Sequence, residues 1–403
     1  SQPILELQFL VVGYALRCSS QETSLMAKAI RVLLLTNYRE DRQRSMLRFS
    51  DLLLSHLPKD KVNLEEIHPK THLHKLCPLG KCKKWAGYID KYLLFPRCLT
   101  NRLQNKLSPI DIVHIIDQSN AVYLPKIQNA KSLPKLLTCH DLIALRTAQN
   151  EFPEAPKTSA NGKRLQNWIH RSLPYADAYA CDSSRTEMDL NRITPISKGR
   201  STLIHLGVQP ERGDDNSIDD MPFDPMNTDF LLHVGSSAWY KNRKRLLKAF
   251  VDVKEGGNLK TLKLILVGPL PQLEELTEKT DNWLKDNPKE LTVLSDLSES
   301  RLQTLYENAN ALIFPSLIEG FGWPPLEARS LGCPVIASKT GAMDDILGSS
   351  AIYVDPMCTK DIVKKIKEIL DADWTNGLPP HIPTAKECVQ AYENLYQRLV
   401  EPK

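Results

Sequence analysis

Two carboxylates, Glu319 and Glu327, stand eight positions apart in the run EGFGWPPLE, around a glycine turn and a pair of prolines. The apolar run at 311–315 directly before them is typical of a buried strand. Gly320 and Gly322 keep the turn free of side-chain bulk, and the prolines suit a first helical turn, where an amide hydrogen would be unpaired. The pattern therefore predicts a strand, a loop that carries Glu319 and a helix whose first turn carries Glu327.

The start of such a helix favours an anionic ligand, because its free amides and the positive end of its dipole point toward the loop. Carboxylates beside an anion site suit a ligand that also carries hydroxyl groups, since a carboxylate is a strong acceptor for sugar O–H donors. A phosphate group and sugar hydroxyls occur together in a nucleotide-sugar. We therefore expect a nucleotide-sugar to bind between the two glutamates.

Length and composition narrow the class of protein. A chain of 403 residues is too long for one ordinary core and predicts two domains. A net charge of +4 is too small to argue for nucleic acid as a partner, and no run approaches the ~20 apolar residues of a membrane-spanning helix. The nine cysteines are scattered and odd in number, which favours a reducing compartment over a disulfide framework. We therefore expect a globular protein of two domains in a reducing compartment, the cytoplasm.

Short apolar runs alternate with amphipathic stretches, such as 243–254 and Glu299–Asn308, along most of the chain. This order predicts strands buried on both faces, helices between them and mostly parallel sheets, that is, two Rossmann-like domains. Residues 210–229 hold seven acids, one arginine and three prolines without periodicity, which is typical of a linker or insertion. The strand candidates are Ile30–Leu35, 110–116, Lys135–Cys139, Ala178–Cys181, Phe230–Val234, 262–267, Leu291–Leu294, Ala311–Phe314, 334–337 and 351–354.

Several short segments occur in a fixed order and together resemble the retaining GT-B glycosyltransferases commonly called family 4. The resemblance runs from about Ile30 to the last helix, and it implies two Rossmann-like domains that face each other across a cleft. The segments are DIVH at 111–114, TCHDL at 138–142, SSRT at 183–186, HLGV at 205–208, HVGS at 233–236, KN at 241–242, LILVG at 264–268, LYENA at 305–309, FPS at 314–316, the glutamate pair and GCPVIA at 332–337.

The resemblance also divides the chain. Residues 1–25 are an extension of unknown role, and 26–209 form the acceptor-side N-terminal domain. The linker or insertion at 210–229 leads to a nucleotide-sugar-binding domain at 230–383. Residues 384–403 form a final helix that returns to the N-terminal domain.

The resemblance assigns roles to individual residues. Glu319 would contact the hydroxyls of the donor sugar, and Glu327 the hydroxyls of the ribose. Lys241 would neutralise the diphosphate leaving group, and His140 would reach the donor sugar from the N-terminal domain. Enzymes of this kind need no metal, because lysine and backbone amides balance the charge that develops on the diphosphate. The remaining donor contacts that it implies are Gly235, Ser236, Asn242, Gly320, Phe321 and Gly322.

The implied function is transfer of a hexose from a UDP- or GDP-sugar to an unknown glycan, lipid-linked or small-molecule acceptor, with retention of configuration. Two alternatives remain. A catalytically inactive nucleotide-sugar-binding protein would explain Tyr240, which stands where the family often has arginine, unless Arg243 or Arg245 replaces it. A nucleotide-sugar epimerase of similar fold would need an acid/base pair on the sugar ring, and the sequence reveals none. Each site residue could also have a purely structural role. Glu327 could complement a helix dipole, Lys241 could be an ordinary solvated lysine, and His140 could be a capping or core histidine.

The segment from Lys75 to Lys106 holds eight lysines and arginines against one acid, Asp90, interleaved with aromatic and aliphatic residues. A basic amphipathic element of this kind can lie on the cytoplasmic face of an anionic membrane. The alternative is a helix with its apolar face in the core and its lysines in solvent.

Ser184 with Glu187 predicts a helix-capping box. A zinc site is not expected, because the spacing of its candidate ligands is irregular: His68, His72, His74, Cys77 and Cys82.

Overall fold

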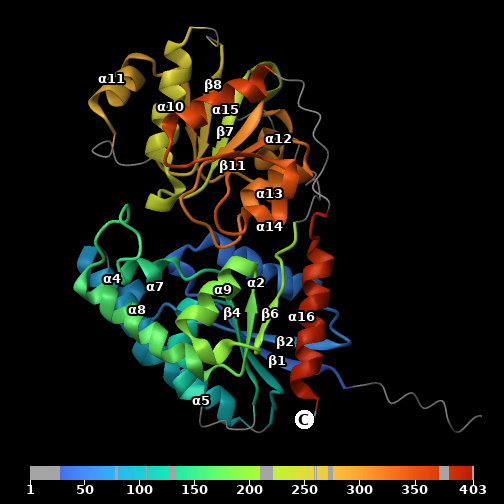
Figure 1. Cartoon of the computed structure of the whole chain (residues 1–403). Coiled ribbons are helices and arrows are strands. Elements are labelled where there is room, and N and C mark those ends of the chain that lie inside the picture. Colours follow the sequence, from blue (N-terminus) through green and yellow to red (C-terminus); the bar gives the residue numbers. More distant parts are fainter. Residues whose placement is uncertain are drawn as a thin grey trace, which may run out of the picture.

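The computed structural model describes residues 28–77, 80–105, 107–127, 133–208, 221–257, 259, 261–270, 276–371 and 381–401. The expected extension at 1–25 and most of the expected linker at 210–229 lie outside these residues. Two six-stranded parallel sheets, each packed with helices, form a lower, N-terminal lobe and an upper, C-terminal lobe in Figure 1. The predicted α/β class with two Rossmann-like domains is confirmed.

The N-terminal sheet has the strand order β2-β1-β3-β4-β5-β6. Strands β3, β4 and β5 are buried along their whole length, because their apolar runs lie inside a sheet covered by helices. The strands are β1 (Ile30–Leu35), β2 (Val62–Ile67), β3 (Ile112–Ile115), β4 (Lys135–Cys139), β5 (Ala178–Cys181) and β6 (Ser201–Leu203).

Helices of this lobe connect the strands. One continuous helical segment runs from α4 through a π-helical turn, η2, into α5. The helices are η1 (Arg39–Asp41), α2 (Arg44–His56), α3 (Leu73–Leu76), α4 (Gly80–Ile89), η2 (Asp90–Leu94), α5 (Phe95–Gln104), α6 (Leu124–Ile127), α7 (Ile143–Ala148), α8 (Ala160–Ser172) and α9 (Ser184–Ile193).

The C-terminal sheet has the strand order β12-β11-β10-β7-β8-β9. Its central strands again carry the apolar runs, and their carboxyl ends share one edge of the sheet because all six are parallel. The strands are β7 (Phe230–Val234), β8 (Lys263–Val267), β9 (Leu291–Leu294), β10 (Ala311–Phe314), β11 (Val335–Ser338) and β12 (Ile352–Val354). The helices are η8 (Trp239–Lys241), α10 (Arg243–Glu255), α11 (Glu278–Asp286), α12 (Glu299–Asn308), α13 (Trp323–Ser330), α14 (Met343–Leu347) and α15 (Thr359–Asp371).

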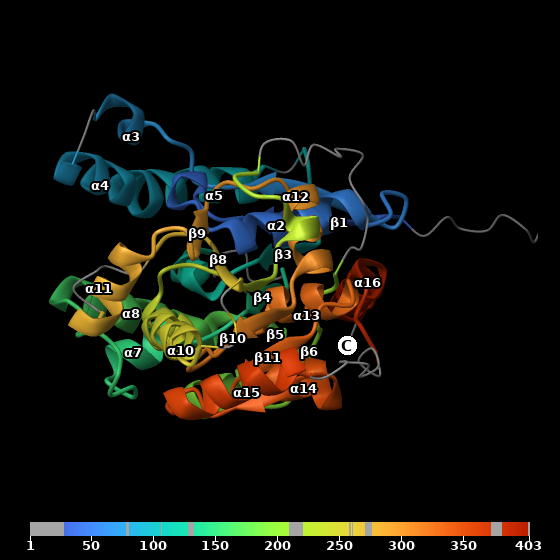
Figure 2. The same ribbon diagram turned by 90° about the horizontal axis from the view of Figure 1, so that it is seen from above.

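The last helix, α16 (Ala385–Val400), lies on the N-terminal lobe, where it contacts α2, β1 and β3 (Figures 1 and 2). Thr384 and Glu387 close a capping box at its start. Tyr396 is hydrogen-bonded to His114 at 2.7 Å, and Tyr392 to Thr138 at 3.0 Å, both in the buried interior of this lobe. Helix α16 is therefore attached to the N-terminal lobe.

Two local predictions are wrong. Glu327 is the fifth residue of α13, which begins at Trp323, so it lies in the second turn and not the first. The prolines do occupy the first turn. The cap of α9 is Ser183, whose hydroxyl accepts a hydrogen bond from the amide of Thr186, and not Ser184. Helix α13 starts one residue before the prolines, which leaves Glu327 just beyond its first turn, and α9 starts one residue earlier than a cap at Ser184 would require.

Candidate active site

Lys241 and Glu319 form an ion pair at the carboxyl edge of the C-terminal sheet, in which Glu319 is buried and Lys241 is partly buried. Nζ of Lys241 donates to Oε1 of Glu319 at 2.8 Å and lies 3.0 Å from Oε2. Lys241 ends η8, which follows β7, and Glu319 lies in the loop after β10. These two strands are neighbours in the sheet, and this brings together two residues that are 78 positions apart. The same ammonium lies 4.7 Å above the ring of Phe314.

Glu327 is buried on α13 and both of its carboxylate oxygens have partners. Oε2 accepts a hydrogen bond from the hydroxyl of Tyr306 at 3.0 Å, and Oε1 is paired with Arg48 of the N-terminal domain. Arg48 lies on α2, stacks its guanidinium 4.4 Å over the ring of Trp323 and also lies 3.4 Å from Glu299. The structure therefore places the first domain against the carboxylate that was predicted to hold the ribose.

His140 lies at the end of β4, but its ring points into the N-terminal domain. Its Nδ1 lies 3.1 Å from Asp182, and its Nε2 lies 2.9 Å from the carbonyl oxygen of Ile116. Because a carbonyl and a carboxylate only accept, both ring nitrogens donate and the imidazolium is the favoured form. Burial opposes the charge, but the hydrogen bond to Asp182, the charges of Asp182 and Asp117 and the bond to the carbonyl of Ile116 together outweigh it and raise the pKa of His140. The ring is engaged away from the Lys241–Glu319 pair.

The turn after Glu319 touches the N-terminal domain so closely that a side chain would not fit. A Cβ atom at Gly320 would lie 2.3 Å from the carbonyl oxygen of His140 and 2.9 Å from Cβ of Asp141. Ser183 donates a hydrogen bond to the carbonyl of Gly320 at 2.7 Å, and Thr186 donates to the carbonyl of His140 at 3.0 Å. The glycine is required here by the close approach of two backbones.

Gly322 also needs to be glycine, for a different reason. Its φ of +103° is unfavourable for other residues, and a Cβ would lie 2.0 Å from Cε of Met343. Phe321, between the two glycines, is buried and lies 6.2 Å from the ring of His205 of the other domain. Phe321 therefore packs in the core and anchors the turn.

Three predicted donor contacts follow β7: Ser236 is exposed, whereas Gly235 and Asn242 are packed against other residues. The aliphatic part of Lys241 lies over Gly235. Asn242 is buried, and its side-chain amide donates to the carbonyls of Pro315 and Pro356 at 2.9 and 2.7 Å. Asn242 holds the start of α10 against the neighbouring loops, so its amide is committed to the protein backbone.

The structure assigns Arg243 to a structural role. Its guanidinium donates to the carbonyls of Pro269, Gly235 and Val267, and burial lowers its pKa to about 10. Arg245 donates to the side chain of Asn242 at 3.0 Å. Neither arginine reaches the Lys241–Glu319 pair through these contacts.

Asp141 is the acidic side chain that the N-terminal domain places beside the turn at Gly320. Its carboxylate accepts a hydrogen bond from the amide of Ile143 at 2.9 Å. Burial raises the pKa of Asp141 to about 6, the Ile143 amide works against this shift, and the charges of Asp117 and Asp182 add to it. Burial also raises the pKa of Tyr240, and the charges of Glu319 and Asp141 add to this shift. Asp141 was part of a matching segment, but no role had been predicted for it.

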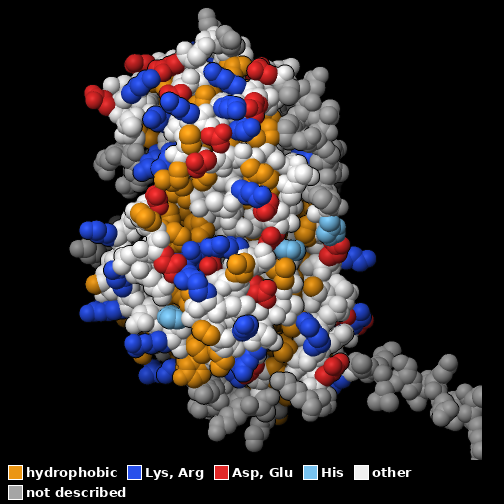
Figure 3. Space-filling model, viewed as in Figure 1, with side chains coloured by type: hydrophobic (Ala, Val, Ile, Leu, Met, Phe, Trp, Pro, Cys, Tyr) orange, Lys and Arg blue, Asp and Glu red, His pale blue; other side chains and the backbone are white. Residues whose placement is uncertain are grey.

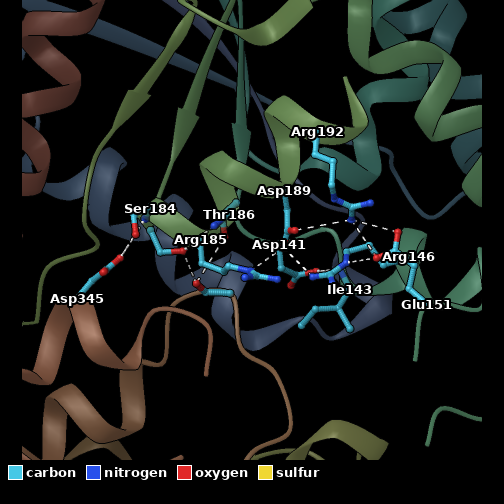
Figure 4. A network of polar contacts seen from close by, with 12 residues as sticks. Asp141, Ile143, Arg146, Glu151, Ser184, Arg185, Thr186, Asp189, Arg192 and Asp345 are labelled. Carbon is cyan, nitrogen blue, oxygen red and sulfur yellow. Dashed lines mark hydrogen bonds and ion pairs between the residues drawn. The ribbon is translucent and has the colours of Figure 1, made fainter. Parts of the chain in front are cut away.

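A network of arginines and acids supports this edge of the N-terminal domain (Figure 4). Arg146 of α7 lies between Asp189 of α9 at 2.7 Å and Glu151 at 2.8 Å. Its guanidinium is 4.6 Å from the ring of Phe152, which in turn packs on Trp239 of the C-terminal domain at 5.4 Å. The network therefore connects the first domain to η8, the turn that ends in Lys241.

Most of these interdomain residues were missed by the sequence reasoning. Ser183 and Thr186 belong to a segment that matched the family, so their order in the chain was the available signal. Arg48 and Trp239 have no such signal, because only the packing of the two domains brings them to the site.

Among the described residues, no group of three or more His, Cys, Asp or Glu side chains could hold a metal ion. No helix within the described residues is long and apolar enough to cross a membrane.

Comparisons with known proteins relate the C-terminal half to glycosyl transferases. A family model described as "Glycosyl transferases group 1" matches residues 216–389. The O-antigen chain mannosyltransferase RfbU of Salmonella typhimurium is 33% identical over 147 residues, 36% of this chain and 40% of that protein. The capsular polysaccharide biosynthesis glycosyltransferase CapM of Staphylococcus aureus is 29% identical over 187 residues, 45% of this chain and 47% of that protein. The chain thus spans less than half the length of these two curated relatives.

Solved structures resemble nearly the whole chain. Sucrose-phosphate synthase from Thermosynechococcus elongatus matches with a TM-score of 0.66 and 17% identity, over 92% of this chain and 97% of that one. The lipopolysaccharide outer core galactosyltransferase WaaB matches with a TM-score of 0.59 and 14% identity, over 92% of this chain and all of that one, at 100%. At these identities the likeness concerns the fold alone. The chain has the GT-B fold, and its residues 216–389 match the group 1 glycosyl transferases.

Proposed function

We propose that the protein is a metal-independent retaining glycosyltransferase that moves a hexose from a UDP- or GDP-sugar to a carbohydrate, lipid-linked or small-molecule acceptor. The observation that carries the proposal is the partly buried pair of Lys241 and Glu319 beside Gly320, where the two domains meet. The pair lies at the carboxyl ends of parallel strands, which is where open α/β sheets bind their ligands. It also lies within the residues that match the glycosyl transferase family.

The two charges suit the two halves of a nucleotide-sugar. When the bond between the anomeric carbon and the diphosphate oxygen breaks, the diphosphate keeps the electron pair and gains negative charge. Lys241 would leave the carboxylate of Glu319 and form an ion pair with this diphosphate. Glu319 would then accept hydrogen bonds from the sugar hydroxyls. An ammonium group in a buried site offers the stabilisation that a metal ion would otherwise give. The acceptor hydroxyl would attack from the same face, so no protein nucleophile is assigned.

The N-terminal domain would contribute through the residues after β4. The resemblance gave the ring of His140 this role, whereas both of its nitrogens have partners inside the domain. The backbone of His140 and the side chain of Asp141 are the groups that lie next to Gly320. We therefore propose that His140 holds the end of β4 in position and that Asp141 is the side chain nearest the donor.

One observation favours the alternative of a nucleotide-sugar-binding protein without turnover. Tyr240 occupies the position of the second cationic clamp, and Arg243 is committed to three backbone carbonyls. Lys241 would then face the leaving group alone. Nothing comparable favours an epimerase, because an acid/base pair around a sugar ring has not been identified.

The test is a donor screen by thermal stabilisation and by slow hydrolysis of the sugar, with EDTA present. GDP-mannose comes first, because several relatives are named mannosyltransferases, followed by UDP-glucose, UDP-galactose and UDP-N-acetylglucosamine. Wild type is compared with Lys241→Ala and Glu327→Ala, and with Lys244→Ala, an exposed lysine of α10, as the matched control. One donor that stabilises and is hydrolysed by wild type and the control, but by neither site variant, supports the proposal. Stabilisation without hydrolysis selects the binding protein, and no stabilisation by any donor overturns both.

A further inference from the structure

The helical segment formed by α4, η2 and α5 exposes large apolar side chains to solvent. Trp85, Ile89 and Leu93 are spaced four residues apart and are 61%, 38% and 53% exposed. Residues four apart share one face of a helix, so these three form what we call the apolar stripe. Leu76, at the end of α3, is 77% exposed as well. Figure 2 shows α3 and α4 at an outer corner of the molecule, beyond the C-terminal lobe.

The exposed charges of the segment itself have one sign, while Glu40 and Asp41 of η1 lie beside it, next to His74 and Lys91. The only acid of the segment, Asp90, is buried, and its carboxylate accepts from the amides of Leu73 and His74 at 2.9 and 3.0 Å. It therefore presents no negative charge at the surface. Among the described side chains, the exposed cations are Lys83, Lys84 and Arg97 of the segment and Lys75 of α3.

The aromatic surface continues onto α8. Tyr88 stacks on Tyr92, and Tyr92 packs against Trp168 of α8 with ring centroids 5.3 Å apart. Trp168 is 40% exposed. The chain has no Asp or Glu from 155 to 176, and three exposed cations of α8 are Lys163, Arg164 and Arg171. Figure 3 shows Lys and Arg side chains along the edge of the lower lobe where α4 and α8 lie in Figure 1.

We propose that this face, the apolar stripe with the lysines beside it, docks on the surface of an anionic lipid bilayer. Tryptophan and aliphatic side chains insert at the boundary of headgroups and acyl chains, and the surrounding lysines and arginines bind the headgroups. The alternative in which the apolar side of the segment fills the core accounts for Phe95 and Leu99, which are buried, but leaves the stripe uncovered. Nucleic acid fits less well, because Ile89 and Leu93 offer no ring on which a base could stack.

The helical segment formed by α4, η2 and α5 contacts the loop that leads to the candidate active site. Lys91 is paired with Asp41 at 2.9 Å, and the hydroxyl of Tyr38 donates to Asp90 at 3.3 Å. This loop continues directly into α2, which carries Arg48 to Glu327. If the proposed function holds, a docked molecule would take its acceptor from the bilayer surface. The docking itself does not depend on that function.

The test is flotation of the full chain with vesicles of phosphatidylcholine alone and of phosphatidylcholine with phosphatidylglycerol. We expect binding to the anionic vesicles only, weakened by salt because the Debye length shortens. Lys83→Glu with Lys84→Glu should weaken binding by roughly tenfold or more, since each cation near such a surface contributes appreciably. Trp85→Ser with Leu93→Ser should also abolish flotation, although it changes no charge. Lys364→Glu with Lys365→Glu, on α15 of the other domain, is the control with the same charge change.

A second measurement follows Trp85 in an otherwise unchanged protein. Brominated lipids should quench part of the tryptophan fluorescence of wild type, and this part should be missing in Trp85→Phe. No binding to anionic vesicles overturns the proposal, and so does binding that all the variants retain. Concentration-dependent self-association that Trp85→Ser removes would show that a second copy of the chain covers the stripe, which also overturns it. Because no donor is used, these results are independent of the donor screen.

Discussion

Arg48 of the N-terminal domain is paired with Glu327 of the C-terminal domain, and Tyr306 donates to the same carboxylate. The pair joins α2 to α13 across 279 positions of the chain. Glu327 is the residue that the family resemblance assigns to the ribose of the donor. A ribose and Arg48 would therefore compete for one carboxylate.

The first prediction concerns this competition. Arg48→Ala frees Glu327, so we expect the donor found by the screen to bind several-fold more tightly, as measured by titration calorimetry. Arg44→Ala is the matched control, because Arg44 also projects from α2 but is paired with Asp296. Weaker binding in Arg48→Ala would mean that Arg48 contacts the donor itself and does not compete with it.

The Lys241–Glu319 pair should also contribute to stability. Glu319 is buried and the side chain of Lys241 is only 12% exposed, so Lys241→Met leaves Glu319 as an uncompensated charge and should lower the free energy of unfolding by about 3–5 kcal/mol. Glu319→Gln should have a similar effect. The double variant should lose less than the sum of the single variants, because the two charges are then removed together. Urea unfolding of the four proteins measures this coupling, and additive losses would show that the two residues do not interact.

Gly320→Ala should separate the two domains. A Cβ at this position would collide with the backbone of His140, which cannot move as a flexible side chain would. We expect the hydrogen bond from Ser183 to be lost, a larger radius of gyration in solution scattering and a loss of about 1–3 kcal/mol in stability. Gly332→Ala is the control: it also adds a methyl group, at a strained φ of +82°, but with open space around it. A normal radius in Gly320→Ala would contradict the close contact.

Asp141 gives a prediction about pH. Because its pKa in the folded protein is about 6, the folded state holds a proton that the unfolded state has lost between about pH 4 and 6. The contribution of Asp141 to stability therefore falls as the pH rises through this range. Asp141→Asn keeps the acceptor for the amide of Ile143 and removes the titration. Relative to wild type, its free energy of unfolding should rise from pH 4 to pH 7; a constant difference would show that the pKa of Asp141 is not raised.

The sequence by itself determined most of the fold. All ten predicted strands are present, because each is a short apolar run, and most of these runs are buried inside a sheet. The edge strands β9 and β12 are less buried but keep their apolar residues. Strands β2 and β6 were not predicted, because they lack such an apolar run. Both lie at the edges of their sheet, where polar residues such as Glu65 and Glu66 are tolerated and the pattern disappears.

The sequence also identified Lys241, Glu319 and Glu327 as chemically important, since glycines, prolines and charges at fixed spacing depend only on local structure. The tertiary structure decided their partners. It paired Lys241 with Glu319 because β7 and β10 are neighbours, turned the ring of His140 toward Asp182, and committed Arg243 to backbone carbonyls. Such contacts join residues that are far apart in the chain, and no local pattern of residue types records which side chains will meet when two domains pack.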